Sequence, residues 1–156
     1  IFARSNMNKR QQDIAWELAQ KAHEGQTRRD GKTAYFIHVV DVARVAGDRF
    51  GFNDKLIATA LLHDCLEDTE LSEKKMEEAG ICQEVIEAVQ WLTFNKENRL
   101  PDWMERSYEK KIQTLKESNN QLAIRVKIAD NLSNLADDPT DKQILKYAKS
   151  LQILMS

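Results

Sequence analysis

Glycine and proline are scarce in this chain, and their scarcity limits the folds that it can adopt. Five glycines and two prolines among 156 residues leave few turn residues for a fold of many short strands. Alanine, leucine, glutamate, lysine and glutamine are abundant, and these residues favour helices. We therefore expect an all-α fold, a compact bundle of about eight helices that forms a single domain over residues 1–156.

The pattern of apolar residues divides this domain into helices. Expected helices cover residues 8–23, 38–50, 53–65, 71–80, 83–93, 102–116 and 140–154. Residues 121–134 are ambiguous, because part of this segment alternates between apolar and charged residues as a strand would. Leu122, Val126 and Ala129 fit a helix better, and no partner strand is expected elsewhere, so a helix is predicted here as well.

The charge balance excludes some classes of protein. Lysine and arginine number 23 against 25 aspartates and glutamates, so the chain lacks the global basic field of a nucleic-acid binder. No apolar run approaches the length of a membrane span. A cytoplasmic protein is expected, with Cys65 and Cys82 reduced and buried as small apolar side chains. Residues 1–7 are expected to be disordered or left over from cloning.

A histidine–aspartate pair, His63-Asp64, follows a nearly continuous apolar helix. Polar groups at the end of such a buried segment are costly unless a metal or partner groups compensate them. His38 and Asp130 supply a second imidazole and a second carboxylate, and the chain has only three histidines. Such a mixed nitrogen and oxygen set suits Mn²⁺, Fe²⁺ or Zn²⁺. The alternative is that His63 and Asp64 form a helix C-cap and a solvated turn.

Two further carboxylates lie close to this pair. If the helix continues for one more turn, Glu67 lies four residues after His63, and Asp68 four residues after Asp64. Both would then share a surface with the pair. A metal held there can activate a water for attack on phosphorus, and a nearby carboxylate can take its proton.

Positive charge is concentrated in the polar loop at residues 26–32. Arg28, Arg29 and Lys32 could clamp phosphates, with an arginine plane available to stack on a base. An ordinary solvated loop is the alternative.

Other conspicuous residues are assigned structural roles. His23 lies at the end of an expected helix and could cap it, and no catalytic role is predicted for it. The run 109–111, Glu-Lys-Lys, is expected to be a solvated helix face. Packing in the core or at its rim is expected of Trp16, Trp91 and Trp103.

Four stretches resemble the HD-superfamily phosphohydrolases, specifically the hydrolase domain of Rel/SpoT-type alarmone enzymes and their small stand-alone relatives. They are AHEGQTRR at 22–29, YFIH at 35–38 with VA at 42–43, ALLHDCLEDT at 60–69 and VKIADNLSNL at 126–135. A lone His-Asp pair would be a weak signal, whereas the third stretch is a strong one. Tyr147-Ala148 in the last expected helix resembles the same family more weakly.

The resemblance implies an HD-type helical bundle that holds one Mn²⁺, with Fe²⁺ or Zn²⁺ as alternatives. The implied ligands are His38, His63, Asp64 and Asp130. Glu67 and Asp68 match residues that handle protons around the attacking water. The implied substrate contacts are Arg28 and Arg29 for base and phosphates, Asn134 for the nucleotide, and Tyr147 in the lining of its pocket.

The implied reaction is hydrolysis of the 3′-pyrophosphate ester of guanosine tetra- or pentaphosphate, which releases pyrophosphate and GDP or GTP. Ser133 and Ala136 stand where the family often has histidine and arginine, and Ala34 and Val39 where proline is common. Two alternatives therefore stay open: an HD phosphohydrolase for another nucleotide or a phosphorylated dinucleotide, and a non-catalytic nucleotide-sensing module. A small-molecule nucleotide is the expected partner, without nucleic acid or membrane, and the oligomeric state is left open.

Overall fold

The computed structural model describes residues 9–156, so the expectation for residues 1–7 lies outside the described chain. Its helices are α2 (Gln11–Ala22), α3 (Tyr35–Phe50), α4 (Asp54–Leu62), α5 (Cys65–Asp68), α6 (Glu73–Glu78), α7 (Gln83–Trp91), α8 (Tyr108–Glu117), α9 (Gln121–Leu135) and α10 (Asp141–Leu154), with a 3₁₀ turn, η1 (Trp103–Glu105). Extended pairing within residues 9–156 is limited to an isolated bridge between Thr27 and Ala34. The expected all-α fold is confirmed.

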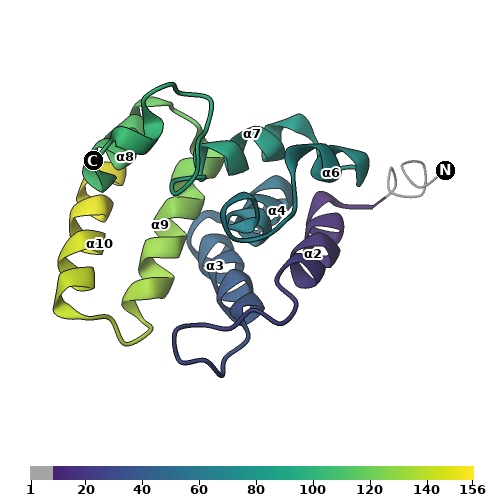
Figure 1. Ribbon diagram of the computed structural model, residues 1–156, viewed down its shortest axis with the longest axis horizontal. Coiled ribbons are helices and arrows are strands. Elements are labelled where there is room, and N and C mark those ends of the chain that lie inside the picture. Colours follow the sequence, from purple (N-terminus) through teal and green to yellow (C-terminus); the bar gives the residue numbers. More distant parts are fainter. Residues whose placement is uncertain (1–8) are drawn as a thin grey trace.

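Helix α4 lies at the centre of the molecule (Figure 1). Every residue from Leu56 to Leu62 is buried, as expected of a nearly continuous apolar run. Helices α2, α3, α7 and α9 all pack against α4. Removal of this apolar surface from water, worth roughly 25 cal/mol per Å², is the main favourable contribution to folding. None of the helices in residues 9–156 is long and apolar enough to span a bilayer.

Side-chain caps fix the ends of the central helices. Asn53 Oδ1 accepts a hydrogen bond from the backbone N–H three residues later, at 3.1 Å, as its sequence position predicts. Asp54 caps a different helix, because its carboxylate oxygens accept the backbone N–H groups of Gln11 and Gln12, each at 2.9 Å. Arg10, the N-cap residue of α2, makes no capping bond with its own side chain. Helix α4 therefore supplies the cap of α2.

The ambiguous segment 121–134 is helical, as predicted, and forms most of α9. Its N-cap is Asn120, whose Oδ1 accepts the Ala123 N–H at 3.0 Å. The helix packs against α3, α4 and α10, and it buries Asp130 and Asn131 among apolar residues. A buried carboxylate on a central helix needs compensating partners, so its surroundings mark a candidate functional site.

The helix expected to run to residue 65 ends at Leu62 instead. His63 and Asp64 form a turn, and the short helix α5 begins at Cys65. Backbone N–H groups of Glu67 and Asp68 bond to the Asp64 carbonyl oxygen at 3.2 and 3.0 Å. The turn thus separates Asp64 and the carboxylates of α5 from the continuous helix α4.

The helix predicted to begin at residue 102 is wrong in its first part. Residues 103–105 form only the 3₁₀ turn, Arg106 is extended, and α8 begins after Ser107, whose hydroxyl caps it. Tertiary hydrogen bonds explain the difference, because the Trp103 indole N–H donates to the Phe94 carbonyl oxygen at 3.2 Å. The Arg106 guanidinium also donates to the Thr114 hydroxyl, on α8, at 2.9 Å. Such contacts outweigh helix propensity.

Candidate active site

His38, His63, Asp64 and Asp130 converge although they lie on distant segments. His38 comes from α3, His63 and Asp64 from the turn between α4 and α5, and Asp130 from α9. His63 Nε2 lies 3.0 Å from Asp64 Oδ2 and 3.6 Å from Asp130 Oδ1. His38 Nε2 lies 3.1 Å from the same Asp130 oxygen. The structure thus brings together the four residues that the sequence assigned to a metal.

Hydrogen bonds on the outer side of each imidazole fix which nitrogen faces this cluster. His63 Nδ1 lies 2.6 Å from the Ala60 carbonyl oxygen, which can only accept, so Nδ1 carries a proton. Ser133 donates its hydroxyl proton to Asp41 Oδ2 at 2.6 Å. The 3.4 Å contact between Ser133 Oγ and His38 Nδ1 therefore places a proton on that nitrogen too. Nε2 is therefore the nitrogen of each ring that faces the cluster, and it can bind a metal ion once it has lost its own proton.

This arrangement fits a divalent cation. His63 Nε2 is buried and makes no hydrogen bond within the described residues. Burial alone would lower the pKa of His63, but the carboxylates of Asp64 and Asp130 outweigh burial and raise that pKa. His38, His63 and Asp130 offer ligand atoms within 4.8 Å of one another. Two imidazole lone pairs and two carboxylates form a donor set suited to a divalent ion.

Tyr35 contacts this cluster, although it is not among the site residues predicted from the sequence. Its hydroxyl donates a hydrogen bond to Asp64 Oδ2. Burial and the negative charge of Asp64 raise the pKa of Tyr35, so its hydroxyl stays protonated and remains a donor. The Tyr35 ring lies 5.0 Å from that of His23 and 5.5 Å from that of His38, between centroids. Its place three residues before His38 on one helix was the available signal.

Glu67 and Asp68 lie beside Asp64, and the three residues offer carboxylate oxygens within 4.8 Å of one another. Glu67 accepts hydrogen bonds from the backbone N–H groups of Phe94 and Asn95. Burial raises the pKa of Glu67, although these bonds oppose the shift. Burial and the charge of Asp64 raise the pKa of Asp68. Carboxyl groups with raised pKa values are suited to exchange protons during catalysis.

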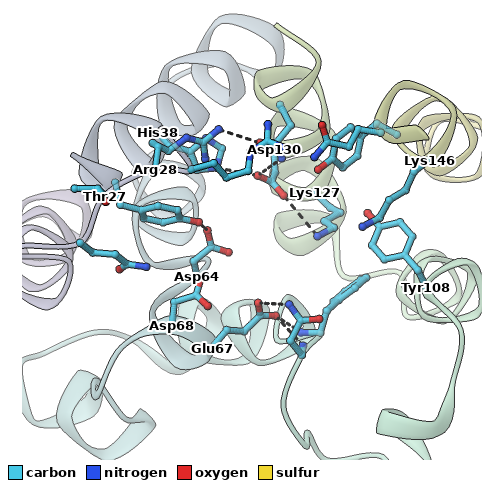
Figure 2. Close-up of a pocket in the computed structure, with 18 residues that line it drawn as sticks. Thr27, Arg28, His38, Asp64, Glu67, Asp68, Tyr108, Lys127, Asp130 and Lys146 are labelled. Carbon is cyan, nitrogen blue, oxygen red and sulfur yellow. Dashed lines mark hydrogen bonds and ion pairs between the residues drawn. The ribbon is translucent and has the colours of Figure 1, made fainter. Parts of the chain in front are cut away.

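These groups open into a pocket of about 360 Å³, within the usual size of small-molecule sites. Of the site residues predicted from the sequence, only His63, which is buried, and Lys32 do not line this pocket. Figure 2 shows Asp64, Glu67 and Asp68 on one side of the pocket, and Tyr108 and Lys146 on the other. The pocket therefore has an acidic side, where the predicted metal ligands lie, and a second side with aromatic and basic groups.

The predicted arginines differ in their partners. Arg28 Nη2 lies 2.5 Å from Asp137 Oδ2 and 3.5 Å from Asn134 Oδ1. Asn134 Nδ2 in turn donates to Asp130 Oδ1 at 3.2 Å. Arg28 is thus held against α9, whereas Arg29 lines the pocket and forms no ion pair among residues 9–156. Arg29 is the arginine more available to an anionic ligand.

Two lysines complete the basic side and were not singled out from the sequence. Lys127 Nζ lies 3.5 Å from Asp130 Oδ2 and 4.2 Å from the centroid of the Phe94 ring. Lys146 Nζ lies 4.2 Å from the centroid of the Tyr108 ring, with no ion pair in the described part of the chain. Burial and the charge of Lys127 lower the pKa of Lys146. A bound anion would relieve this repulsion.

Residues assigned structural roles behave largely as expected. His23 is the C-cap residue of α2 and is buried, with Nδ1 2.7 Å from Gln26 Oε1. Cys65 is buried, Cys82 is partly buried, and neither forms a disulfide. Two residues differ from expectation: Cys82 is less buried than predicted, and Lys111, which was expected on a solvated face, is buried.

The sequence pattern of the HD domain matches residues 15–151, which include all the residues of this cluster. The chain belongs to the HD-domain family. The resemblance stated from the four stretches is therefore confirmed at the level of the family.

Proteins similar to this HD domain have names that specify a reaction. A guanosine-3′,5′-bis(diphosphate) 3′-pyrophosphohydrolase, MESH1, from Xenopus tropicalis is 36% identical over 126 residues, or 79% of this chain and 66% of that protein. The enzyme of the same function name from Aquifex aeolicus is 30% identical over 121 residues, or 78% of this chain and 17% of that protein. Bifunctional (p)ppGpp synthase/hydrolase SpoT from Escherichia coli is 32% identical over 123 residues, again 78% and 17%. The chain thus spans only part of each relative.

A solved structure has the same fold as this HD domain. It is that of a metazoan orthologue of SpoT, described as hydrolysing ppGpp and as having a role in starvation responses. The two structures superpose with a TM-score of 0.75 over 92% of this chain and 85% of the other, at 24% sequence identity. At this identity the match establishes the HD-type helical fold.

Proposed function

We propose that this protein is a metal-dependent phosphohydrolase that cleaves the 3′-pyrophosphate group from guanosine tetra- or pentaphosphate. The observation that carries the proposal is the pocket itself, where the acidic cluster faces a basic side across a cavity of nucleotide-binding size. Relatives from Xenopus, Aquifex and Escherichia whose names include this hydrolase support the choice of substrate.

His38, His63, Asp64 and Asp130 would hold the metal ion, for which Mn²⁺ is the proposed identity. When bound there, such an ion supplies a Lewis acid and lowers the pKa of a bound water. Hydrogen bonds to the Ala60 carbonyl oxygen and to Ser133 Oγ keep a proton on Nδ1 of His63 and of His38. The other nitrogen of each ring, Nε2, is then the one that can bind the metal. Tyr35 orients Asp64 through its hydroxyl hydrogen bond.

Glu67 and Asp68 would exchange protons with the reacting groups. One accepts a proton from the attacking water, and the P–O bond to the ribose 3′ oxygen breaks as the water oxygen bonds to phosphorus. The 3′ oxygen would leave as a hydroxyl after it takes a proton from the other carboxyl group, and pyrophosphate would be released. The raised pKa values of both carboxyls suit this exchange, because each can be protonated and deprotonated without extreme pH.

The remainder of the substrate would lie toward the basic side. Arg29, Lys127 and Lys146 place positive charge where the phosphates that are not cleaved can bind. The rings of Tyr108 and Tyr147 line the same side and can contact a base or ribose. A substrate with anionic groups at two separate positions fits this arrangement better than a simple monophosphate.

Product analysis over a panel of nucleotides tests this proposal. The panel contains guanosine tetraphosphate, a phosphorylated dinucleotide and simple nucleoside monophosphates, each with metal-stripped protein and with added Mn²⁺. Manganese-dependent release of pyrophosphate from the tetraphosphate is the expected result. Orthophosphate release from another member of the panel would replace the substrate, and binding without hydrolysis of any member would favour a sensing module.

A further inference from the structure

Lys111 is buried in the folded chain, although its sequence context predicted an exposed helix face. It is 8% exposed, on the face of α8 that also buries Ile112 and Leu115. Lysine is almost never buried without a partner, because removing an ammonium group from water is costly. Lys111 forms no ion pair within residues 9–156, so no carboxylate compensates its charge there.

The partner of Lys111 is a backbone carbonyl group. Its Nζ donates to the Phe94 carbonyl oxygen at 2.7 Å, and the Trp103 indole N–H donates to the same oxygen at 3.2 Å. Trp103 is 1% exposed, and Lys111 Nζ lies 5.6 Å from the centroid of its ring. Both lone pairs of this one carbonyl are therefore occupied by buried donors, one of them charged.

The other end of the same peptide group reaches the active site. The Phe94 carbonyl and the Asn95 N–H belong to one amide, and that N–H donates to Glu67 Oε1 at 3.3 Å. The Phe94 N–H donates to the same oxygen, and the Asn95 side-chain amide reaches Glu67 Oε2 at 3.4 Å. Donors on a carbonyl polarise its amide and strengthen donation by the N–H. The charge of Lys111 thus acts on Glu67 through a single peptide group.

We propose that Lys111, assisted by Trp103, is a positioning residue that holds residues 94–95 against Glu67 and so fixes the Glu67 carboxylate for proton exchange. The inference rests on the proposed function, because Glu67 has its catalytic role there. The same Phe94 packs its ring 4.2 Å from Lys127 Nζ, so this residue connects Glu67 with the Asp130 side of the site.

The test compares four variants in the full chain, each checked by thermal unfolding. Lys111→Met removes the ammonium but keeps the length of the side chain, and Lys111→Arg restores a charge. Trp103→Phe removes the second donor and keeps a ring, in case Lys111→Met fails to fold. Lys110→Met is the matched control, because Lys110 is the exposed neighbour on the same helix.

We expect Lys111→Met to lower kcat by about tenfold or more, with KM changed less than twofold, because the reacting groups are misplaced while binding is retained. Trp103→Phe should lower kcat less, Lys111→Arg should restore part of the loss, and Lys110→Met should have no effect. On a Glu67→Gln background, Lys111→Met should cause no further loss of kcat. The same fold loss on both backgrounds, or unchanged kcat in Lys111→Met, would overturn the proposal.

Amide hydrogen exchange separates this inference from the proposed function. The Asn95 amide should exchange about tenfold faster in Lys111→Met than in the wild type, with Lys110→Met like the wild type. An inactive wild-type protein would remove the proposed function, while the exchange of Asn95 would still decide the positioning role. Equal protection of Asn95 in Lys111→Met and wild type would overturn it.

Discussion

Asp64 lies between the predicted metal ligands and the other two carboxylates, since it is 3.0 Å from His63 Nε2 and offers an oxygen within 4.8 Å of those of Glu67 and Asp68. We predict that Asp64→Ala abolishes binding of the divalent ion and hydrolysis together, because one ligand and the Tyr35 contact are lost. Calorimetric titration with Mn²⁺ measures the binding, and circular dichroism checks that the variant is folded. Binding of Mn²⁺ with wild-type affinity by a folded Asp64→Ala protein would exclude Asp64 as a ligand.

Glu67 has a different position from the four predicted ligands, because backbone N–H groups of residues 94 and 95 bind its carboxylate. We predict that Glu67→Ala leaves Mn²⁺ affinity unchanged and lowers turnover by roughly 10²–10⁴-fold, the usual loss when acid–base assistance is removed. Glu70→Ala is the matched control, since Glu70 is an exposed carboxylate three residues later. Wild-type turnover in Glu67→Ala would remove Glu67 from the reaction.

Burial of Glu67 also makes the stability of the metal-free protein depend on pH. Its raised pKa means that the folded state holds this proton to higher pH than the unfolded state does. This contribution to stability is therefore present at low pH and is lost as pH rises through the folded-state value. We predict that metal-free Glu67→Gln unfolds at a higher temperature than the wild type at pH 7, and that the difference shrinks toward pH 4. Calorimetry at both pH values measures it, and an equal difference at both would contradict this linkage.

Among the elements, α2 depends on α4 for its N-terminal cap. Asp54 accepts the N–H groups of Gln11 and Gln12, so Asp54→Ala leaves two donors of α2 without this partner. We predict a loss of about 1 kcal/mol in the free energy of unfolding, the usual cost of losing an N-cap. Urea denaturation measures it, with Mn²⁺ affinity unchanged because the cap is outside the metal cluster.

Asp48→Ala is a control for this cap, because Asp48 forms an exposed ion pair with Arg44 at 2.9 Å. Removal of an exposed ion pair changes the free energy of unfolding by less than about 1 kcal/mol. If Asp54→Ala costs no more than Asp48→Ala, the hydrogen bonds from Asp54 do not stabilise α2.

The sequence predicted most helices but not the places where tertiary contacts interrupt them. The apolar run of α4 and the cap at Asn53 are local signals, and both were found. The break before α8 was missed, because it depends on Trp103 and Phe94, which meet only in the folded chain. Lys111 was misassigned for the same reason: its charge indicated solvent, whereas its acceptor lies 17 residues away on another segment.

At the scale of the whole molecule, the predicted metal ligands connect α3, the turn after α4, and α9. An ion bound there stabilises the folded state, because the unfolded chain does not bring these ligands together. At Mn²⁺ concentrations 100 times Kd, we predict about 2.7 kcal/mol of added stability and a rise in Tm of roughly 5–10 °C. Differential scanning calorimetry measures this shift. An equal shift in Asp64→Ala would show that Mn²⁺ acts elsewhere.

The pocket as a whole was predictable only in part. Its metal-ligand set follows from the His-Asp pair and the family resemblance, since these residues stand in recognisable stretches. Its basic side was found only in part: Arg29 was predicted, whereas Lys127 and Lys146 were not, because their position at the pocket depends on how α9 and α10 pack near Phe94 and Tyr108. Tyr35 was missed because its contact with Asp64 spans 29 residues.

The most direct test is a titration of metal-stripped protein with Mn²⁺ in which binding and pyrophosphate release from guanosine tetraphosphate are followed in the same samples. Electron paramagnetic resonance reports free Mn²⁺, and an enzyme-coupled assay reports pyrophosphate. We predict one bound equivalent, with hydrolysis rising in parallel and saturating at that equivalent, and neither signal in Asp64→Ala. Hydrolysis at full rate without metal, or Mn²⁺ binding that Asp64→Ala leaves unchanged, would contradict the assignment of this cluster as the catalytic metal site.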